Sequence, residues 1–424
     1  MPNLTRRLFL TSAVGGVVIR CRSLRAHQEA SMAPISGEAV PGFEAIDGLM
    51  ASFIAKHRVP GAALAVCNNG MVVYSRGFGY ADIDNKIPVE PEALFRVASL
   101  SKPFTSVAIL QLIEEGKLSM DDHVVDYLNK DDTAKITDPR WSQVTVRHCL
   151  QHTGGWDRAK SSDPVTRPAE IAKVLGISFP VGPGDVVSYA IRQPLDFDPG
   201  ERYAYSNLGY LVLGRIMESV TKKDYEQYVK ERVFGPLGLT GPRLGKALIE
   251  NRFPGEVKYY LPKPVTGSSV TPPIVGQSAP LQYGAENFEA FEAHGGWITS
   301  AIDLVKFSSA FDDPGQCPIL GSRGIEEMWK RPTGLAGYQE GGEPRPFYYG
   351  CGWSVRPADR PEKWTARHAG RIAGTGSMVV HGWNGLNWAV VFNTDVNPGK
   401  KSLTDLISDP LAAAIDECVT KMSR

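Results

Sequence analysis

The chain has 424 residues, of which 42% are hydrophobic and 22% are charged, as in folded globular proteins and unlike disordered chains. Its 46 lysines and arginines balance 46 aspartates and glutamates, which argues against a nucleic-acid partner bound through a basic surface. The 43 glycines and 31 prolines predict many turns and irregular loops and exclude a coiled coil. We expect one large domain or two intertwined subdomains.

Residues 1–26 resemble a twin-arginine export signal. Arg6 and Arg7 precede a short apolar run, Leu8 to Ile19, which as a helix would be about 18 Å long and too short to cross a membrane core of about 30 Å. We therefore expect a bacterial protein, exported to the periplasm or secreted, with a mature chain 27–424 that has no membrane span. The alternative is an uncleaved amphipathic N-terminus of a cytoplasmic protein.

The cysteines that follow this segment are five in number and show no C-x-x-C spacing. An odd, scattered set argues against a zinc ribbon and against a dense disulfide framework. We expect most of them to be small core residues.

The mature chain opens with a predicted helix and hairpin. Apolar residues share one face of a helix over residues 43–57, which Pro60 ends. Two β-rich runs, 61–67 and 71–79, flank Asn68-Asn69-Gly70, a strong hairpin signal.

The last part of the chain reads as antiparallel strands and a closing helix. Runs rich in Val, Trp, Thr and Phe predict strands near residues 351–356, 364–369, 375–381 and 388–395, and an amphipathic helix is expected over 402–422.

The fold class expected from this order is α+β. The terminal strands would join into one antiparallel sheet flanked by the N- and C-terminal helices, forming a sheet lobe from about 43–100 and 345–424. The middle, about 101–344, would be an inserted, mostly helical lobe. A cleft between the lobes is the expected site, and the loops at 241–293 and 331–347 are expected to wall it.

Ser99 and Lys102 form an S-x-x-K motif at the start of a predicted buried helix. The segment from Phe104 to Glu115 is apolar on most sides, and Pro103 fits only a first helical turn. The motif residues then share a face, so the amine can reach the hydroxyl. A lysine whose pKa is lowered by burial can take the proton of a serine nucleophile. A bare N-cap serine is the alternative.

Two further pairs could complete such a site. Tyr205 and Asn207 project from one turn before an amphipathic helix. A phenol beside an ammonium group would have a lowered pKa and could shuttle protons, and the amide could bind lysine or a substrate carbonyl. In His368-Ala369-Gly370-Arg371, at the end of a strand, a small residue and a glycine would let a substrate lie along the strand, with a main-chain N–H completing an oxyanion hole.

Each motif has further matches elsewhere in the chain, which their predicted surroundings set aside. The S-x-x-K match would end a helix, where carbonyl groups face outward. The tyrosine match would lie in an acidic surface stretch, and the histidine matches precede helical or loop segments. These matches are Ser219-x-x-Lys222, Tyr127-x-Asn129, His152-Thr153-Gly154 and His294-Gly295-Gly296.

Taken in order, Ser99-x-x-Lys102, Tyr205-x-Asn207 and His368-x-Gly370 resemble the three motifs of the penicillin-recognising serine hydrolases. The most similar branch contains class C β-lactamases, D,D-carboxypeptidases and esterases. The resemblance runs from about residue 43 to 420, with further similar stretches at residues 144–155, 234–239 and 295–300.

The resemblance implies a β-lactamase/transpeptidase-like fold and a serine acyl-transfer enzyme that uses no cofactor and no metal. Ser99 would be the nucleophile, Lys102 and Tyr205 the proton-handling pair, and Asn207 a group that orients a small-molecule or peptide substrate. The backbone N–H groups of Ser99 and Arg371 would form the oxyanion hole. The oligomeric state stays open.

The third motif departs from the β-lactamases of this group. They carry lysine where this chain has His368 and usually a small hydroxyl residue where it has Arg371. Histidine is more similar to the D,D-peptidase and D-aminopeptidase branches. At neutral pH His368 is expected to be mainly a neutral imidazole, which could donate to an ester or amide carbonyl of the substrate. The expected substrates are small esters, D-amino-acid amides or peptides; the alternatives are a class C-type β-lactamase and a non-catalytic protein that binds peptidoglycan or a peptide.

Two other hydrolase classes fit the sequence less well. His148 and His152 lie four apart on a predicted helix, but the segment between them lacks the glutamate base of a metallohydrolase and no further ligand cluster is present. An α/β-hydrolase would need a G-x-S-x-G elbow, and the chain has none.

Overall fold

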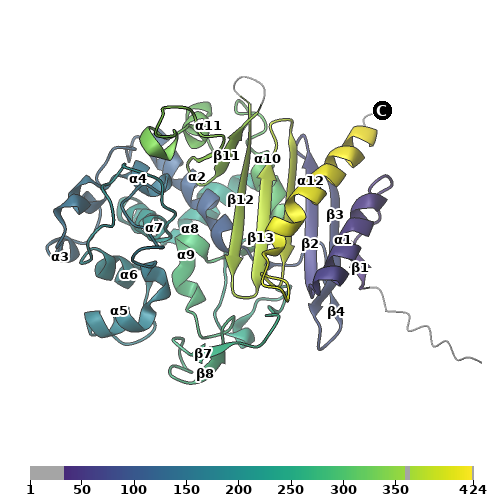
Figure 1. Ribbon diagram of the computed structural model, residues 1–424, viewed down its shortest axis with the longest axis horizontal. Coiled ribbons are helices and arrows are strands. Elements are labelled where there is room, and N and C mark those ends of the chain that lie inside the picture. Colours follow the sequence, from purple (N-terminus) through teal and green to yellow (C-terminus); the bar gives the residue numbers. More distant parts are fainter. Residues whose placement is uncertain (1–32, 359–362, 423–424) are drawn as a thin grey trace, which may run out of the picture. The chain divides into compact units, whose positions relative to one another are not determined.

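Strands from both ends of the chain form one antiparallel sheet (Figure 1). The computed structural model describes residues 33–358 and 363–422, so the expected export signal at 1–26 lies outside the described residues. The sheet order is β1-β3-β2-β14-β13-β12-β11-β10, with β4 paired to β3. The bounds are β1 Ile35–Ser36, β2 Gly61–Asn68, β3 Met71–Asp82, β4 Ile87–Pro88, β10 Tyr348–Tyr349, β11 Ser354–Pro357, β12 Trp364–Ile372, β13 Thr375–His381 and β14 Leu386–Phe392.

The N-terminal hairpin and the C-terminal strands meet in the middle of this sheet. Asn69 and Gly70 have φ of 49° and 78° in the turn between β2 and β3, which suits an Asn-Gly pair. β14 then pairs with β2 along its whole length, with Val390 opposite Leu64. The predicted hairpin and the predicted union of the two ends are therefore confirmed.

Helices cover both faces of the sheet. On one face lie α1 (Glu44–His57) and α12 (Leu403–Met422), which pack side by side in Figure 1. On the other lies α10 (Ala301–Ser309), against β2 and β14. Because both faces are covered, every residue of β13 and β14 is buried. The predicted α+β class is confirmed, but α10 belongs with the sheet although it lies within the range expected for the helical lobe.

The remaining helices gather around α2, the central helix. Ser101 to Leu112 of α2 are all buried, as the apolar segment predicts. The bounds are α2 Ser101–Glu114, α3 Lys130–Thr133, α4 Val146–Leu150, α5 Pro168–Leu175, α6 Pro183–Ala190, α7 Leu208–Thr221, α8 Tyr225–Val229, α9 Glu292–Gly295 and α11 Ser322–Trp329.

The middle of the chain also contains short strands that the sequence did not indicate. β5, β9 and β6 form a small sheet beside the start of α2, and β7 and β8 pair within the predicted 241–293 loop. Strands of two or three residues are too short to show a hydrophobic period. Their bounds are β5 Phe95–Arg96, β6 Arg243–Leu244, β7 Thr266–Ser268, β8 Ser278–Pro280 and β9 Trp297–Thr299.

The cysteines of the described residues form no disulfides. Cys67, Cys149, Cys351 and Cys418 are buried and Cys317 is partly exposed; all five are free thiols.

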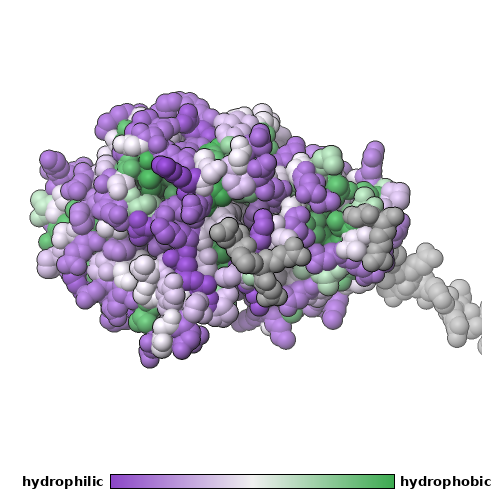
Figure 2. Space-filling model, turned by 90° about the horizontal axis from the view of Figure 1, so that it is seen from above, coloured by the Kyte–Doolittle hydropathy of each residue, from purple (hydrophilic) through white to green (hydrophobic). Residues whose placement is uncertain are grey.

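None of the helices in residues 33–358 and 363–422 is long and apolar enough to cross a bilayer. On the face shown in Figure 2, hydrophilic residues predominate and hydrophobic ones form separate patches.

Candidate active site

Ser99 and Lys102 lie where a short 3₁₀ turn runs into α2. The turn spans Ala98–Leu100, and Ala98 adopts a φ of 49° that non-glycine residues rarely take. The Ser101 hydroxyl donates to the Ala98 carbonyl at 2.7 Å and accepts from the Trp297 N–H, which holds the turn in place. Lys102 Nζ then lies 3.0 Å from Ser99 Oγ.

The amine of Lys102 is fully buried among acceptors. Its Nζ donates to Asn207 Oδ1 and to the His294 carbonyl, each at 2.8 Å. Burial lowers the pKa of Lys102 well below its usual value of 10.5, against the raising effect of the Asp163 carboxylate. The neutral amine, which can act as a base, is therefore favoured.

Tyr205 and Asn207 come from the turn that precedes α7. The Tyr205 hydroxyl donates to Ser99 Oγ at 2.8 Å. The backbone N–H of Asn207 donates to the buried Asp163 carboxylate at 2.8 Å, which fixes the amide beside Lys102. The four motif residues Ser99, Lys102, Tyr205 and Asn207 thus form one hydrogen-bonded cluster.

The expected protonation of Tyr205 is wrong. The sequence predicts that a neighbouring ammonium group lowers its pKa, but burial raises the pKa of this phenol above its usual 10.0. The physical reason is that the neighbouring lysine is itself buried and favours the neutral form, so it supplies little charge to stabilise a tyrosinate. Tyr205 is therefore a proton donor in the resting site.

Strand β12 brings His368 and Gly370 to the same site. Both are buried, while Arg367, Ala369 and Arg371 between and beside them are exposed, as the two-residue period of a strand requires. A Cβ on Gly370 would lie 2.1 Å from the Val97 carbonyl oxygen and 3.1 Å from the Ser99 nitrogen. Only glycine lets β12 approach Ser99 this closely.

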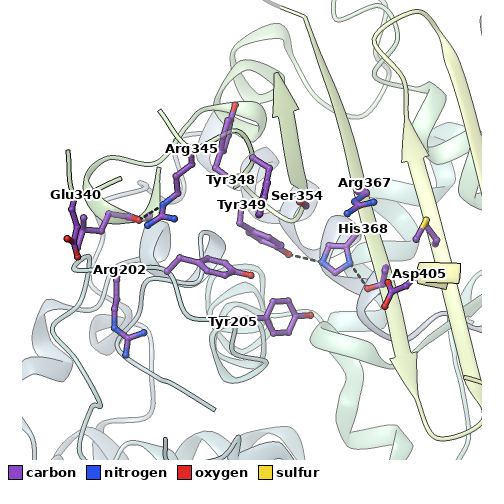
Figure 3. A pocket seen from close by; sticks show the side chains of 16 residues that line it. Arg202, Tyr205, Glu340, Arg345, Tyr348, Tyr349, Ser354, Arg367, His368 and Asp405 are labelled. Atoms are coloured by element: carbon purple, nitrogen blue, oxygen red, sulfur yellow. Dashed lines mark hydrogen bonds between the residues drawn. The ribbon is translucent and has the colours of Figure 1, made fainter. Parts of the chain in front are cut away.

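His368 is neutral but is not a free donor. Burial lowers its pKa to about 3. Its Nδ1 lies 2.9 Å from the Ala369 carbonyl and its Nε2 lies 2.9 Å from the Tyr349 hydroxyl (Figure 3). Because a carbonyl can only accept, Nδ1 carries the proton and Nε2 accepts from Tyr349. The neutral imidazole expected from the sequence is thus already engaged within the protein, which corrects the expectation that it would donate to a substrate.

Arg371 directs its side chain away from this cluster. It shares the exposed face of β12 with Arg367, and its positive charge acts on the Asp395 carboxylate. The guanidinium therefore does not replace the lysine charge of the third motif. The expected role of the Arg371 backbone N–H in an oxyanion hole stays a prediction.

A cavity of about 570 Å³ opens beside the cluster. In Figure 3, Tyr205, Tyr349 and His368 converge on one side of it, and Arg345 and Glu340 form part of another wall. Leu335, Ala336 and Phe347 belong to the 331–347 segment, which therefore walls this cavity as expected. The 241–293 segment instead lines a separate cavity of about 230 Å³ with Leu281 and Glu286.

Two histidines that the sequence set aside border the site. His152 has a φ of 57° and packs its ring 4.3 Å from the Tyr205 ring and 4.4 Å from the Tyr349 ring. His294 supplies the carbonyl that holds Lys102. Motif spacing could not identify either histidine as part of the site, because His152 contributes a packed ring and His294 contributes a main-chain oxygen. Tyr349, too, had no local signal.

The matches set aside on other grounds lie outside the cluster. Ser219 is in the last turn of α7, and Lys222 follows that turn with an exposed side chain. The expected shared helix of His148 and His152 is wrong, because α4 ends at Leu150 and His152 takes a left-handed conformation after it. Within residues 33–358 and 363–422, no group of three or more His, Cys, Asp and Glu side chains is placed to hold a metal ion.

The Beta-lactamase family model matches residues 46–411, most of the described chain. The chain belongs to the beta-lactamase family. This match and the fold place it in the superfamily of penicillin-recognising serine hydrolases that the three motifs resemble.

Individual members of the family are distant relatives. Protein flp of Staphylococcus aureus (strain MW2) is 30% identical over 200 residues, which cover 45% of this chain and 36% of flp. Penicillin-binding protein 4* of Bacillus subtilis (strain 168) is 27% identical over 77% of this chain and 66% of its own length. The chain thus spans little more than a third of the flp relatives that it matches.

The beta-lactamase fold is also seen in solved structures. D-amino acid amidase from Ochrobactrum anthropi SV3, complexed with D-phenylalanine, superimposes with a TM-score of 0.67 over 90% of this chain and 99% of the amidase. At 23% sequence identity, this likeness shows the shared fold alone.

Proposed function

We propose that this beta-lactamase-family protein is a serine hydrolase that works through an acyl-enzyme on Ser99 and cleaves small esters, D-amino-acid amides or peptides. The observation that carries the proposal is the single cluster in which Ser99 Oγ lies 3.0 Å from Lys102 Nζ and 2.8 Å from the Tyr205 hydroxyl. A buried base and a second proton-carrying group at one serine are what acyl transfer requires.

The geometry supports the following proton-transfer steps. Asn207 Oδ1 and the His294 carbonyl can only accept, so a neutral Lys102 amine donates its two hydrogens to them and keeps its lone pair for the Ser99 hydroxyl. Lys102 takes the proton of Ser99 as Oγ bonds to the substrate carbonyl carbon. The proton then passes to the leaving group, through Tyr205, as the scissile bond breaks.

Deacylation returns the enzyme to its first state. A water molecule gives a proton to the Lys102 and Tyr205 pair and its oxygen attacks the acyl carbon; the ester bond to Ser99 Oγ breaks, and Oγ regains a proton. The backbone N–H groups of Ser99 and Arg371 are proposed to stabilise the oxyanion in both steps, because β12 approaches the Ser99 nitrogen closely at Gly370.

The third motif argues against β-lactams as the preferred substrates. His368 stands where the β-lactamases of the group carry lysine, and it is uncharged and bonded to Tyr349 and the Ala369 carbonyl. Arg371 faces the other side of the strand. Neither residue of the third motif therefore offers a fixed cation to a β-lactam carboxylate.

A substrate panel tests the proposal. Purified protein is assayed with p-nitrophenyl acetate, D-phenylalanine amide and nitrocefin, with Ser99→Ala as the matched control. We expect turnover of the ester or the amide, nitrocefin hydrolysis slower by at least tenfold, and loss of all turnover in Ser99→Ala. Nitrocefin turnover as fast as that of the best ester would favour the class C-type β-lactamase. No turnover of any substrate would favour a binding protein.

A further inference from the structure

One arginine, Arg158, stacks on the ring of Tyr205 and has no carboxylate partner in the described part of the chain. Arg158 follows the His152 segment, and its guanidinium carbon lies 4.7 Å from the centre of the Tyr205 ring. The hydroxyl of that ring is bonded to Ser99 Oγ at 2.8 Å. Arg158 therefore contacts the ring of a residue whose hydroxyl is hydrogen-bonded to the proposed nucleophile, Ser99.

The acidic groups beside Arg158 in the chain are bound elsewhere. Asp157 pairs with Arg202 at 2.8 Å. Asp163 is buried and accepts the Asn207 N–H. No ion pair within residues 33–358 and 363–422 includes Arg158, although its side chain is exposed. Stacking on a phenol ring holds the guanidinium plane and leaves its N–H edge for an anion.

Two of the other arginines near the cavity are engaged within the protein. Arg202 holds Asp157, and Arg345 donates to the carbonyls of Leu335 and Tyr338. Arg367 lines the cavity from the face of β12 opposite His368. Among these arginines, Arg158 alone stacks on a residue of the Ser99 cluster while its guanidinium has no acceptor within residues 33–358 and 363–422.

We propose that Arg158 binds a carboxylate of the substrate, so that the preferred substrates are acidic esters or amides with a carboxylate close to the scissile carbonyl. The proposal rests on the proposed function and names its substrate class. Recognition would come from the helical side of the site, through Tyr205 and Arg158, and not from β12. A guanidinium binds a carboxylate through two parallel hydrogen bonds, and a hydrogen bond to a charged group changes affinity by about tenfold to a hundredfold.

The alternative role for Arg158 is purely electrostatic. Its charge also lowers the pKa of Lys102, so its loss could weaken acylation of every substrate. A carboxylate site predicts instead that only acidic substrates lose their advantage. The comparison of matched acidic and neutral substrates separates these roles.

The experiment uses two substrate pairs that differ only in methylation of the acid. 3-Acetoxybenzoate and its methyl ester place the carboxylate on the leaving group; monophenyl glutarate and its methyl ester place it on the acyl group. We expect one pair to show a ratio of kcat/KM, acid over methyl ester, of about ten to a hundred, arising mainly in KM. Arg158→Gln should bring that ratio to about one, and Arg158→Lys should leave an intermediate ratio.

Arg367→Gln is the matched variant, since it removes an arginine that lines the cavity without contacting Tyr205, and it should keep the wild-type ratio. A wild-type ratio near one in both pairs, a ratio that depends on Arg367, or an equal loss for both members in Arg158→Gln would overturn the inference. Labelling of Ser99 by a neutral fluorophosphonate is the separate readout. If labelling persists while the ratio is one, only this inference fails; if wild-type protein shows neither labelling nor turnover, the proposed function fails as well.

Discussion

At the scale of residues, the proposed chemistry depends on a lysine that the fold buries away from water. Lys102 is completely buried, and its two shortest hydrogen bonds go to atoms that can only accept. Both Lys102 Nζ and the Tyr205 hydroxyl lie within hydrogen-bond distance of Ser99 Oγ. The two proton carriers therefore act on one atom, and their effects should not be independent.

We expect Lys102→Ala and Tyr205→Phe each to lower kcat/KM by about 10²–10⁴-fold, the usual contribution of general acid–base catalysis. Because both act on Ser99 Oγ, the double variant should be little worse than the worse single variant. Steady-state kinetics with p-nitrophenyl acetate measure this, with circular dichroism to check folding. Losses that multiply in the double variant would show separate roles.

The pH dependence of Ser99 labelling should follow the protonation states of Lys102 and Tyr205. Lys102 works as a base only when it is neutral, and burial lowers its pKa well below 10.5, so the rate should rise with pH and level off well below that value. Burial raises the pKa of Tyr205 above 10.0, so no fall is expected up to pH 10. A neutral fluorophosphonate serves as the probe. A rise centred near pH 10.5 would contradict a buried neutral lysine.

Some features of the candidate site could be predicted from the sequence and others could not. The S-x-x-K spacing on a buried helix start was sufficient to predict the Ser99–Lys102 contact, because helical geometry brings residues three apart together. The protonation of Tyr205 was predicted with the wrong sign, since burial of both partners depends on α7 and α9 packing around α2. The Arg158–Tyr205 contact joins two loops, and no local pattern reports such a pair.

At the scale of elements, the site depends on how closely β12 approaches the turn before α2. Gly370 packs against the Val97 carbonyl, which also accepts from the Ser377 hydroxyl of β13 at 2.7 Å. The strand and the nucleophile turn are therefore held together by direct main-chain contact. The strand alternation of β12 also places His368 inward and Arg371 outward.

Gly370→Ala should separate these elements. Its Cβ would lie 2.1 Å from the Val97 oxygen, so β12 or the turn must shift, and a misplacement of about 1 Å can cost about a hundredfold in rate. Gly48→Ala, at an open position of α1, is the control and should raise stability by about 1 kcal/mol without changing kcat/KM. Full activity of Gly370→Ala would show that the close approach is not required.

Long periodic elements were predicted well and short ones were not. The helices near 43–57 and 402–422 and the strands of the C-terminal group correspond to α1, α12 and β11–β14 because their apolar faces repeat over several turns or pleats. The small sheet of β5, β6 and β9 joins residues about 50 to 200 positions apart through two-residue contacts. Such pairing follows from tertiary packing and leaves no local period.

At the scale of the whole described chain, one core connects the sheet with the helices around the Ser99 site. Buried residues of β2 and β14 pack in the same cluster as those of α2 and α7, among them Ala65, Val391, Val107 and Leu211. A second cluster beneath α1 and α12 shares the same strands. A substitution that destabilises α12 should therefore also destabilise the active site, because the sheet connects the two.

Leu411→Ala tests this connection. Leu411 is fully buried in α12, and such a truncation costs about 2–5 kcal/mol of unfolding free energy. We expect tryptophan fluorescence and Ser99 labelling to be lost at one shared, lowered urea concentration. Labelling that survives after the fluorescence transition would show that the sheet and the site unfold separately.

The most direct test of the central claim is the identity of the nucleophilic residue. Intact protein is treated with a fluorophosphonate, digested and examined by peptide mass spectrometry, with Ser99→Ala and Ser219→Ala as paired variants. We predict one adduct, on the peptide that contains Ser99, which disappears in Ser99→Ala and persists in Ser219→Ala. An adduct on any other residue, or labelling and turnover that survive in Ser99→Ala, would contradict the assignment of Ser99 as the nucleophile.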